Sequence, residues 1–120
     1  NCSFTLMHSI STYPCKEENL NLINIIKLKE KYGCEVGYSG HESSPGPSVI
    51  AASFGADCIE RHITLDRSMY GSDQSSSLEQ SGLRLLVGMV RKIPTMIGKE
   101  RTAIYDFEEE VAKKLRYWEN

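Results

Sequence analysis

The sequence has little of what marks an exported, membrane-bound or nucleic-acid-binding protein. Its 120 residues contain no apolar run approaching the roughly 18 residues of a transmembrane helix. The opening segment NCSFTLMHSI lacks the basic region and the small-residue cleavage site of a signal peptide. Basic and acidic residues are interspersed, with a net charge of −2, so no electrostatic footprint for nucleic acid or a membrane is present. We therefore expect a cytoplasmic protein of one domain at most.

The cysteines also lack a familiar pattern. Cys2, Cys15, Cys34 and Cys58 include no Cys-x-x-Cys pair. Four cysteines could form two disulfides in a secreted protein. The missing export signal and an ordinary hydrophobic content of 40% instead favour free thiols in a reducing compartment.

What the sequence does contain is an alternation of strand and helix patterns. From Leu20 to Tyr32 apolar residues recur mostly every three or four positions, which is typical of an amphipathic helix, and Gly33 follows as its expected C-cap. Ser77 and Gln80 resemble a capping box. The pattern predicts strands over 3–11, 34–40 and 57–65, and helices over 20–32, 45–56 and 77–97.

This order predicts an α/β fold with a parallel sheet and right-handed crossovers. A parallel sheet needs both faces covered, and three strands leave open edges that invite pairing. We therefore interpret residues 1–97 as part of a larger barrel or doubly wound sheet. Residues 98–120 are expected to form a connector and a short charged helix.

Polar side chains gather where the expected strands end, in the segments HSISTYP, GYSGHE and ERHIT. Sites in parallel α/β folds form at this carboxyl end. All three histidines, His8, His41 and His62, lie on or just beyond these strands. A lone histidine in such a place is more often a core or turn residue than a ligand.

His41 and His62 are harder to dismiss, because they are 21 residues apart, the length of one strand–helix unit. If their strands are neighbours, both imidazoles reach the same end of the sheet, where they suit a divalent transition metal. Carboxylates such as Asp73 or Glu42, water, or residues outside the chain could complete the coordination. Loop 66–77 is either solvated or turns Asp73 towards the pocket.

Three further side chains keep alternatives open. Glu60 and Arg61 could point to opposite faces of their strand, and we expect at least one of them in a structural ion pair, because a buried charge needs a partner. Tyr13 is either a hydrophobic plug or a hydrogen-bonding wall.

The segments LMHSISTYP, VGYSGHE and GADCIERHITLDRSMYGSDQSSSLE, in this order, resemble the C-terminal part of the catalytic domain of the sialic acid synthase family. The resemblance covers roughly residues 5–95. It implies a (β/α)₈ TIM barrel, of which this chain supplies the sixth, seventh and eighth strands. It also implies condensation of phosphoenolpyruvate with N-acetylmannosamine or a related amino sugar, giving a nonulosonic acid and phosphate.

The resemblance also implies roles for individual residues. The family's metal, Mn²⁺ or Mg²⁺, would be held by His41 and His62 and would polarise the sugar aldehyde as a Lewis acid. With Asp73, these histidines form the expected catalytic set. The residues expected to bind substrate are Ser11 and Ser39 on the phosphoenolpyruvate side, and Tyr13 and Asp73 in the sugar pocket.

Some parts of the family pattern differ or fall outside these 120 residues. Gln74 replaces a histidine found in many members, which leaves the identity of the acceptor sugar open. The family's phosphate-binding lysines, its catalytic glutamate and its antifreeze-like domain, which completes the sugar site across a homodimer, are absent from this sequence. We therefore expect the isolated chain to be inactive.

Two other functions are compatible with the same residues. The chain could be a noncatalytic barrel fragment that only associates with its missing part or with another copy. It could also be a metal-dependent aldolase or hydrolase on the same barrel. The absence of a lysine at a strand end argues against Schiff-base aldolase chemistry.

Overall fold

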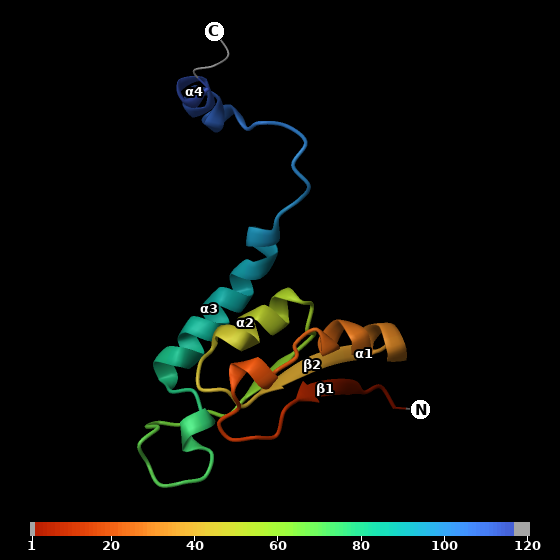
Figure 1. Ribbon diagram of the computed structural model, residues 1–120, viewed down its shortest axis with the longest axis vertical. Helices are drawn as coiled ribbons and strands as arrows, with labels where there is room; N and C mark the ends of the chain where they lie inside the picture. Colours follow the sequence, from red (N-terminus) through yellow and green to blue (C-terminus); the bar gives the residue numbers. More distant parts are fainter. Residues whose placement is uncertain (1, 117–120) are drawn as a thin grey trace.

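The computed structural model describes residues 2–116 as a three-stranded parallel sheet with helices between and after the strands (Figure 1). The strands lie in the order β1-β2-β3, and Ser39 of β2 aligns with Ser9 of β1 and with Glu60 of β3. The elements are β1 (Thr5–Ser9), α1 (Asn24–Tyr32), β2 (Glu35–Gly40), α2 (Gly46–Ser53), β3 (Ile59–Arg61), α3 (Gln80–Ile97) and α4 (Asp106–Leu115), with short 3₁₀ turns at Glu17–Asn19 and Gln74–Ser76. The predicted parallel α/β architecture is confirmed.

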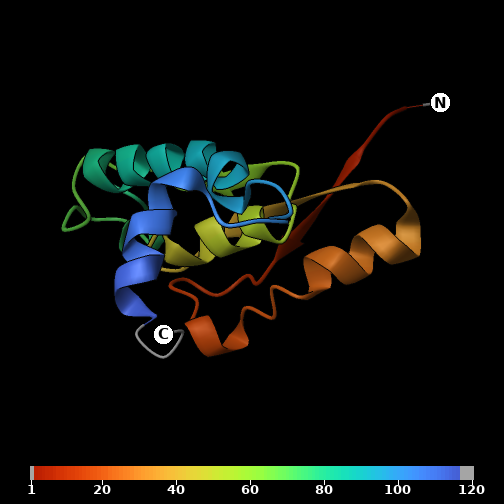
Figure 2. The same cartoon turned by 90° about the horizontal axis from the view of Figure 1, so that it is seen from above.

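The hydrophobic core lies between the sheet and the helices on one of its faces. Figures 1 and 2 show α1 and α2 over the same side of the sheet, with α3 alongside α2. Ile25 of α1, Ala51 of α2, and Val36 and Tyr38 of β2 are fully buried there. Removing such apolar side chains from water stabilises the fold by roughly 1.5–3 kcal/mol each. This packing fixes which face of each strand points away from the helices.

No helix of the described residues covers the opposite face of the sheet (Figure 1). Because strand side chains alternate between faces, this open face carries Met7, Gly37, Ser39, Cys58 and Glu60. A Cβ atom at Gly37 would collide with Cys58 Sγ and Met7 Sδ, so a larger residue there would force these neighbours to shift. A parallel sheet is expected to have both faces covered. This open face is therefore the one that another part of a larger fold would cover.

The start of α3 differs from the start that the sequence predicts. The expected capping box of Ser77 and Gln80 is wrong, because the helix begins at Gln80 with Glu79 in the extended N-cap position. Leu78 instead returns to the sheet: its N–H donates to His62 O over 2.8 Å, and its own carbonyl accepts from Thr64 N over 2.9 Å. This return pairing closes the loop that begins after β3.

Other local predictions are confirmed. Gly33 ends α1 in the left-handed conformation with φ of 59°. All four cysteines are free. The charged terminal helix forms as α4, set apart from the sheet in Figure 1, while residues 117–120 lie outside the described residues. Within residues 2–116, no helix combines the length and apolar character needed to cross a membrane.

Candidate metal and substrate site

His41 and His62 come together at the carboxyl ends of two adjacent strands. Each histidine directly follows its strand, β2 ending at Gly40 and β3 at Arg61. The centroids of the two imidazole rings are 5.2 Å apart. His41 is buried, with 5% of its surface exposed, whereas the side chain of His62 is 36% exposed. The pair therefore forms a small cluster that is closed on the sheet side and open to solvent on the other.

The Nδ1 atoms of both imidazoles face oxygen atoms. His41 Nδ1 lies 3.0 Å from Ile10 O and 3.5 Å from Ser9 Oγ. His62 Nδ1 lies 3.5 Å from Asp73 Oδ2. Such neighbours favour the proton on Nδ1, which leaves the Nε2 lone pair available to a metal ion, as is usual for metal-ligating histidines.

The donor set fits a divalent cation only in part. Two neutral imidazoles suit Mn²⁺ or a similar ion. Among residues 2–116, however, no three histidine, cysteine or carboxylate side chains are grouped closely enough to hold a metal. Asp73 faces the Nδ1 edge of His62 and so supports this histidine instead of completing a triad. His41 and His62 would therefore supply two ligands, with the others coming from elsewhere.

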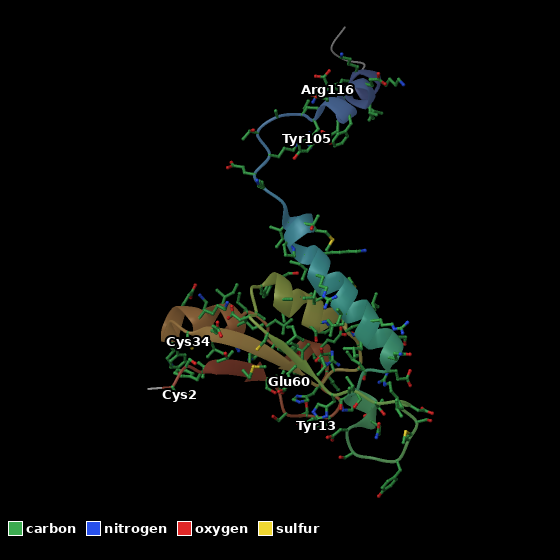
Figure 3. All side chains as sticks on the ribbon, turned by 180° about the vertical axis from the view of Figure 1, so that it is seen from behind. Cys2, Tyr13, Cys34, Glu60, Tyr105 and Arg116 are labelled. Carbon is green, nitrogen blue, oxygen red and sulfur yellow. The ribbon has the colours of Figure 1, made fainter. Side chains whose placement is uncertain are left out.

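Tyr13 lies against both histidines. The centroid of its ring is 4.4 Å from that of His41 and 5.8 Å from that of His62. Its surface is 44% exposed, so one part of the ring packs on the imidazoles and the rest meets solvent. Figure 3 shows Tyr13 beyond the carboxyl ends of the strands, away from Cys34 at the other end of the sheet. Tyr13 therefore lies beside the histidine pair, and these ring contacts are compatible with both a plug and a hydrogen-bonding wall.

Asp73 is presented by a folded loop. Its carboxylate accepts a hydrogen bond from Ser72 Oγ over 2.9 Å, and its backbone carbonyl accepts from Ser76 Oγ and Ser77 Oγ over 3.1 and 2.8 Å. These bonds, together with the pairing of Leu78 to the segment after β3, turn the loop back towards His62. Of the two readings of loop 66–77, the geometry supports the one in which Asp73 faces the site.

Glu60 belongs to the same face of the sheet, although sequence reasoning gave it no role in the site. Ser39 Oγ donates to Glu60 Oε1 over 2.7 Å, across the β2–β3 register. Glu60 precedes His62 by two residues, just as Ser39 precedes His41, so alternation places all four on one side. This two-residue spacing is the feature of the sequence from which the position of Glu60 could have been predicted. Figure 3 shows Glu60 on the sheet.

The remaining candidates lie elsewhere. Ser11 is exposed after β1 and makes no side-chain hydrogen bond within the described part of the chain. Glu42 is not available as a metal ligand, because its carboxylate is buried on the helix-covered side in an ion pair with Arg61. This bears out the expected structural ion pair. His8 is also on that side, with Nε2 2.7 Å from Leu20 O, and fills a core position.

Burial shifts two pKa values in this region. Desolvation lowers the pKa of Arg61, although the nearby Glu42 carboxylate opposes the shift. Desolvation also raises the pKa of Tyr38 well above its ordinary range, and the charge of Glu42 and the hydrogen bond to it add to this effect. The Tyr38 phenol therefore stays protonated at physiological pH and acts as a hydrogen-bond donor.

Comparisons with known proteins agree with the fold and with the motifs. Residues 1–102 match the NeuB family. Over 116 residues the chain is 37% identical to human N-acetylneuraminate-9-phosphate synthase, covering 96% of this chain and 32% of that protein. It is 36% identical over 96 residues to the N,N'-diacetyllegionaminic acid synthase of Campylobacter jejuni, covering 80% of this chain and 29% of that protein.

The structural comparison gives the same result. The sialic acid synthetase of Leptospira borgpetersenii, solved in complex with citrate, aligns with 98% of this chain at a TM-score of 0.76 and 33% identity, and the match covers 41% of that structure. The chain therefore has the fold of part of a sialic acid synthase TIM-barrel domain, as predicted. It spans about a third of the length of the sequence relatives described above. The chain belongs to the NeuB family, alongside relatives named as sialic, legionaminic and pseudaminic acid synthases.

Proposed function

We propose that this chain is the C-terminal part of the catalytic barrel of an enzyme that condenses phosphoenolpyruvate with N-acetylmannosamine or a related amino sugar. The products would be a nonulosonic acid and phosphate. The observation that carries the proposal is the convergence of His41 and His62, each with an oxygen at Nδ1, at the carboxyl end of the sheet. The names of the relatives suggest this reaction.

His41 and His62 would hold a Mn²⁺ or Mg²⁺ ion through their Nε2 atoms. Such an ion supplies Lewis-acid polarisation of the sugar aldehyde. The surrounding residues of this chain would orient the two imidazole rings. The carbonyl of Ile10, 3.0 Å from Nδ1, would orient the imidazole of His41, and the Asp73 carboxylate, 3.5 Å from Nδ1 of His62, would favour the orientation of the second imidazole. Rigid support of this kind keeps reacting groups in position.

The substrate-facing roles follow from the same geometry. The exposed part of Tyr13 offers one wall for the sugar, and the Asp73 carboxylate, whose side chain is 45% exposed, can accept hydrogen bonds from sugar hydroxyls. Ser39 lies deeper on the open face, where its hydroxyl can turn from Glu60 towards a phosphate oxygen. The basic groups that phosphate binding needs would come from other parts of the barrel.

The function is tested in the full polypeptide that the gene encodes. After removal of metal with a chelator, phosphoenolpyruvate and N-acetylmannosamine are supplied together. We expect the release of phosphate from phosphoenolpyruvate to require added Mn²⁺. His41→Ala and His62→Ala should abolish it. His8→Gln is the matched control, because His8 bonds to the Leu20 carbonyl and packs near Tyr38 on the helix-covered side of the sheet. Turnover by either alanine variant at the wild-type rate would rule out the proposed site.

A noncatalytic fragment is the second candidate. It is favoured by the sheet face that no helix of the described residues covers. In that case the isolated chain, supplied with Mn²⁺ and both substrates, should show no turnover but should associate with the rest of a barrel or with another copy. A metal-dependent aldolase or hydrolase would differ by turning over without phosphoenolpyruvate. The proposal also includes N-acetylmannosamine or a related amino sugar as the acceptor, Mn²⁺ or Mg²⁺ as the metal, and a homodimer of the full polypeptide.

A further inference from the structure

A buried ion pair lies next to the two histidines, on the helix-covered side of the sheet. Arg61 Nη1 is 2.8 Å from Glu42 Oε1, and the two side chains are 2% and 1% exposed. Glu42 follows His41 in the chain, and Arg61 precedes His62. Because neighbouring residues of an extended chain point to opposite sides, the ion pair faces the helices while the histidines face the site. Each charged residue is thus joined to one histidine by a single peptide unit.

The guanidinium group of Arg61 binds three separate segments of the chain. Nη1 donates to Ser44 O over 2.9 Å and to Ser48 Oγ over 3.1 Å. Nη2 donates to Glu42 O, and to Ser76 O over 3.4 Å. These acceptors belong to the turn after His41, to α2, and to the end of the loop that carries Asp73. One side chain therefore ties together the segments that present His41, His62 and Asp73.

The Glu42 carboxylate is equally well bonded. Besides Arg61, it accepts hydrogen bonds from Tyr38 Oη over 2.9 Å and from Ser48 Oγ over 3.2 Å. A buried ion pair is weak support for stability by itself, because apolar residues of similar volume often stabilise a fold as well or better. What an apolar pair cannot do is fix two strand ends through directional hydrogen bonds. The geometry suits positioning more than stability.

We propose that Arg61 and Glu42 are positioning residues that set the spacing of His41 and His62 and hold the Asp73 loop against them. This inference rests on the proposed metal site. The pair acts through the backbone and touches neither substrate nor metal. Outer groups that orient ligating histidines commonly change metal affinity about 10- to 100-fold when they are altered.

The test measures Mn²⁺ binding to the full, metal-stripped polypeptide by electron paramagnetic resonance, together with thermal unfolding. Arg61→Lys keeps the charge but loses the fork that reaches several carbonyls, and Glu42→Gln keeps the shape but removes the charge. We expect both variants to bind Mn²⁺ about 10- to 100-fold more weakly than wild type. Lys29→Met is the control: it breaks the 2.8 Å pair with Asp57, which precedes β3 at the other end of the sheet, and should leave Mn²⁺ affinity unchanged.

Ser48→Ala is a milder variant, for the case in which Arg61→Lys or Glu42→Gln does not fold. It removes one contact from each partner while leaving both charges in place. We expect a smaller but measurable weakening of Mn²⁺ binding, of about twofold to fivefold, because one of several hydrogen bonds is lost. If Arg61→Lys does not fold, the affinity of Ser48→Ala decides the question.

The outcomes separate this inference from the function on which it rests. Wild-type Mn²⁺ affinity in folded Arg61→Lys, or in Ser48→Ala where the former does not fold, would overturn the positioning role. In that case, loss of binding in His41→Ala would still support the metal site. If His41→Ala and His62→Ala bind Mn²⁺ as tightly as wild type, or if wild type binds none, the metal site fails and the positioning role fails with it.

Discussion

The hydroxyl of Ser39 donates to the carboxylate of Glu60 over 2.7 Å across two neighbouring parallel strands, and each residue stands two positions before a histidine of the candidate site. The two strands thus present the same sequence of layers to the open face, first a serine–glutamate pair and then a histidine pair. The phosphate-side and metal-side functions proposed here would then occupy successive layers of one surface.

Replacement of Ser39 by alanine tests the deeper layer. In the full polypeptide, Ser39→Ala should raise KM for phosphoenolpyruvate about tenfold, because a hydrogen bond to a charged group contributes about 1.5 kcal/mol. KM for the amino sugar serves as the internal control and should stay near the wild-type value. Steady-state kinetics with each substrate varied in turn gives both constants. An unchanged KM for phosphoenolpyruvate would remove Ser39 from the phosphate side.

Two substitutions of Tyr13 distinguish a plug from a hydrogen-bonding wall. Its ring packs 4.4 Å from His41, so Tyr13→Phe keeps that contact and loses only the hydroxyl. If Tyr13 is a wall that binds the sugar, we expect Tyr13→Phe to raise KM for the amino sugar about threefold to tenfold, by loss of one hydrogen bond. Tyr13→Leu, which also removes the ring, should have a larger effect. Wild-type kinetics for Tyr13→Phe with a defect only in Tyr13→Leu would identify a plug.

Gly37 provides a test of the open face that does not involve catalysis. Gly37→Ala should destabilise the fold by about 1–3 kcal/mol, because the added Cβ would collide with Cys58 Sγ and Met7 Sδ. Gly88 is the matched control. It lies in α3 with nothing within 4 Å of an added Cβ, so Gly88→Ala should stabilise the helix by about 0.5–1 kcal/mol. Chemical denaturation of the two variants should therefore shift in opposite directions.

Asp57 should make stability depend on acid pH. The hydrogen bond from Lys29, followed by that from the Val36 N–H, lowers the pKa of its carboxyl below 3.8. A lowered folded-state pKa contributes stability that is present above 3.8 and is lost as the pH falls through the folded value. Asp57→Asn should therefore be less stable than wild type at pH 7, by about 1 kcal/mol, and the difference should shrink below pH 3.8.

Unfolding curves at several pH values check this prediction. Lys27 and Glu30 form an exposed ion pair one helical turn apart, so Glu30→Gln is a suitable control with little expected effect at any pH. A constant difference between wild type and Asp57→Asn across the acid range would contradict the assignment of the pKa shift.

The sequence predicted the elements and the meeting of His41 and His62 because both follow from periodicity. Side-chain alternation and the spacing of one strand–helix unit are local patterns that packing then preserves. The capping of α3 could not be predicted in the same way. Ser77 has the right residue type, but the return pairing of Leu78 with His62 draws this segment to the sheet. That tertiary contact is invisible in a short window of sequence.

The two glutamates show the same limit. The sequence leaves Glu42 open as a candidate metal ligand, yet its carboxylate lies on the opposite side of the sheet, where it pairs with Arg61. The sequence predicts no role for Glu60 in the site itself, although this residue shares the face of His62. Strict alternation would have assigned both correctly. What alternation could not predict is that Arg61 also reaches Ser44 and Ser76, since this depends on how two loops fold back.

The order His41–Glu42 beside Arg61–His62 also guards against mispairing of the strands. If β3 slipped by one residue, its side chains would exchange sides: Arg61 would turn away from the helices, His62 would enter the core, and Glu42 would be buried as an uncompensated charge. No partly slipped arrangement could keep both the charges neutralised and the histidines together. The same four residues would therefore let the chain reject a wrong register during folding, before any substrate or metal is bound.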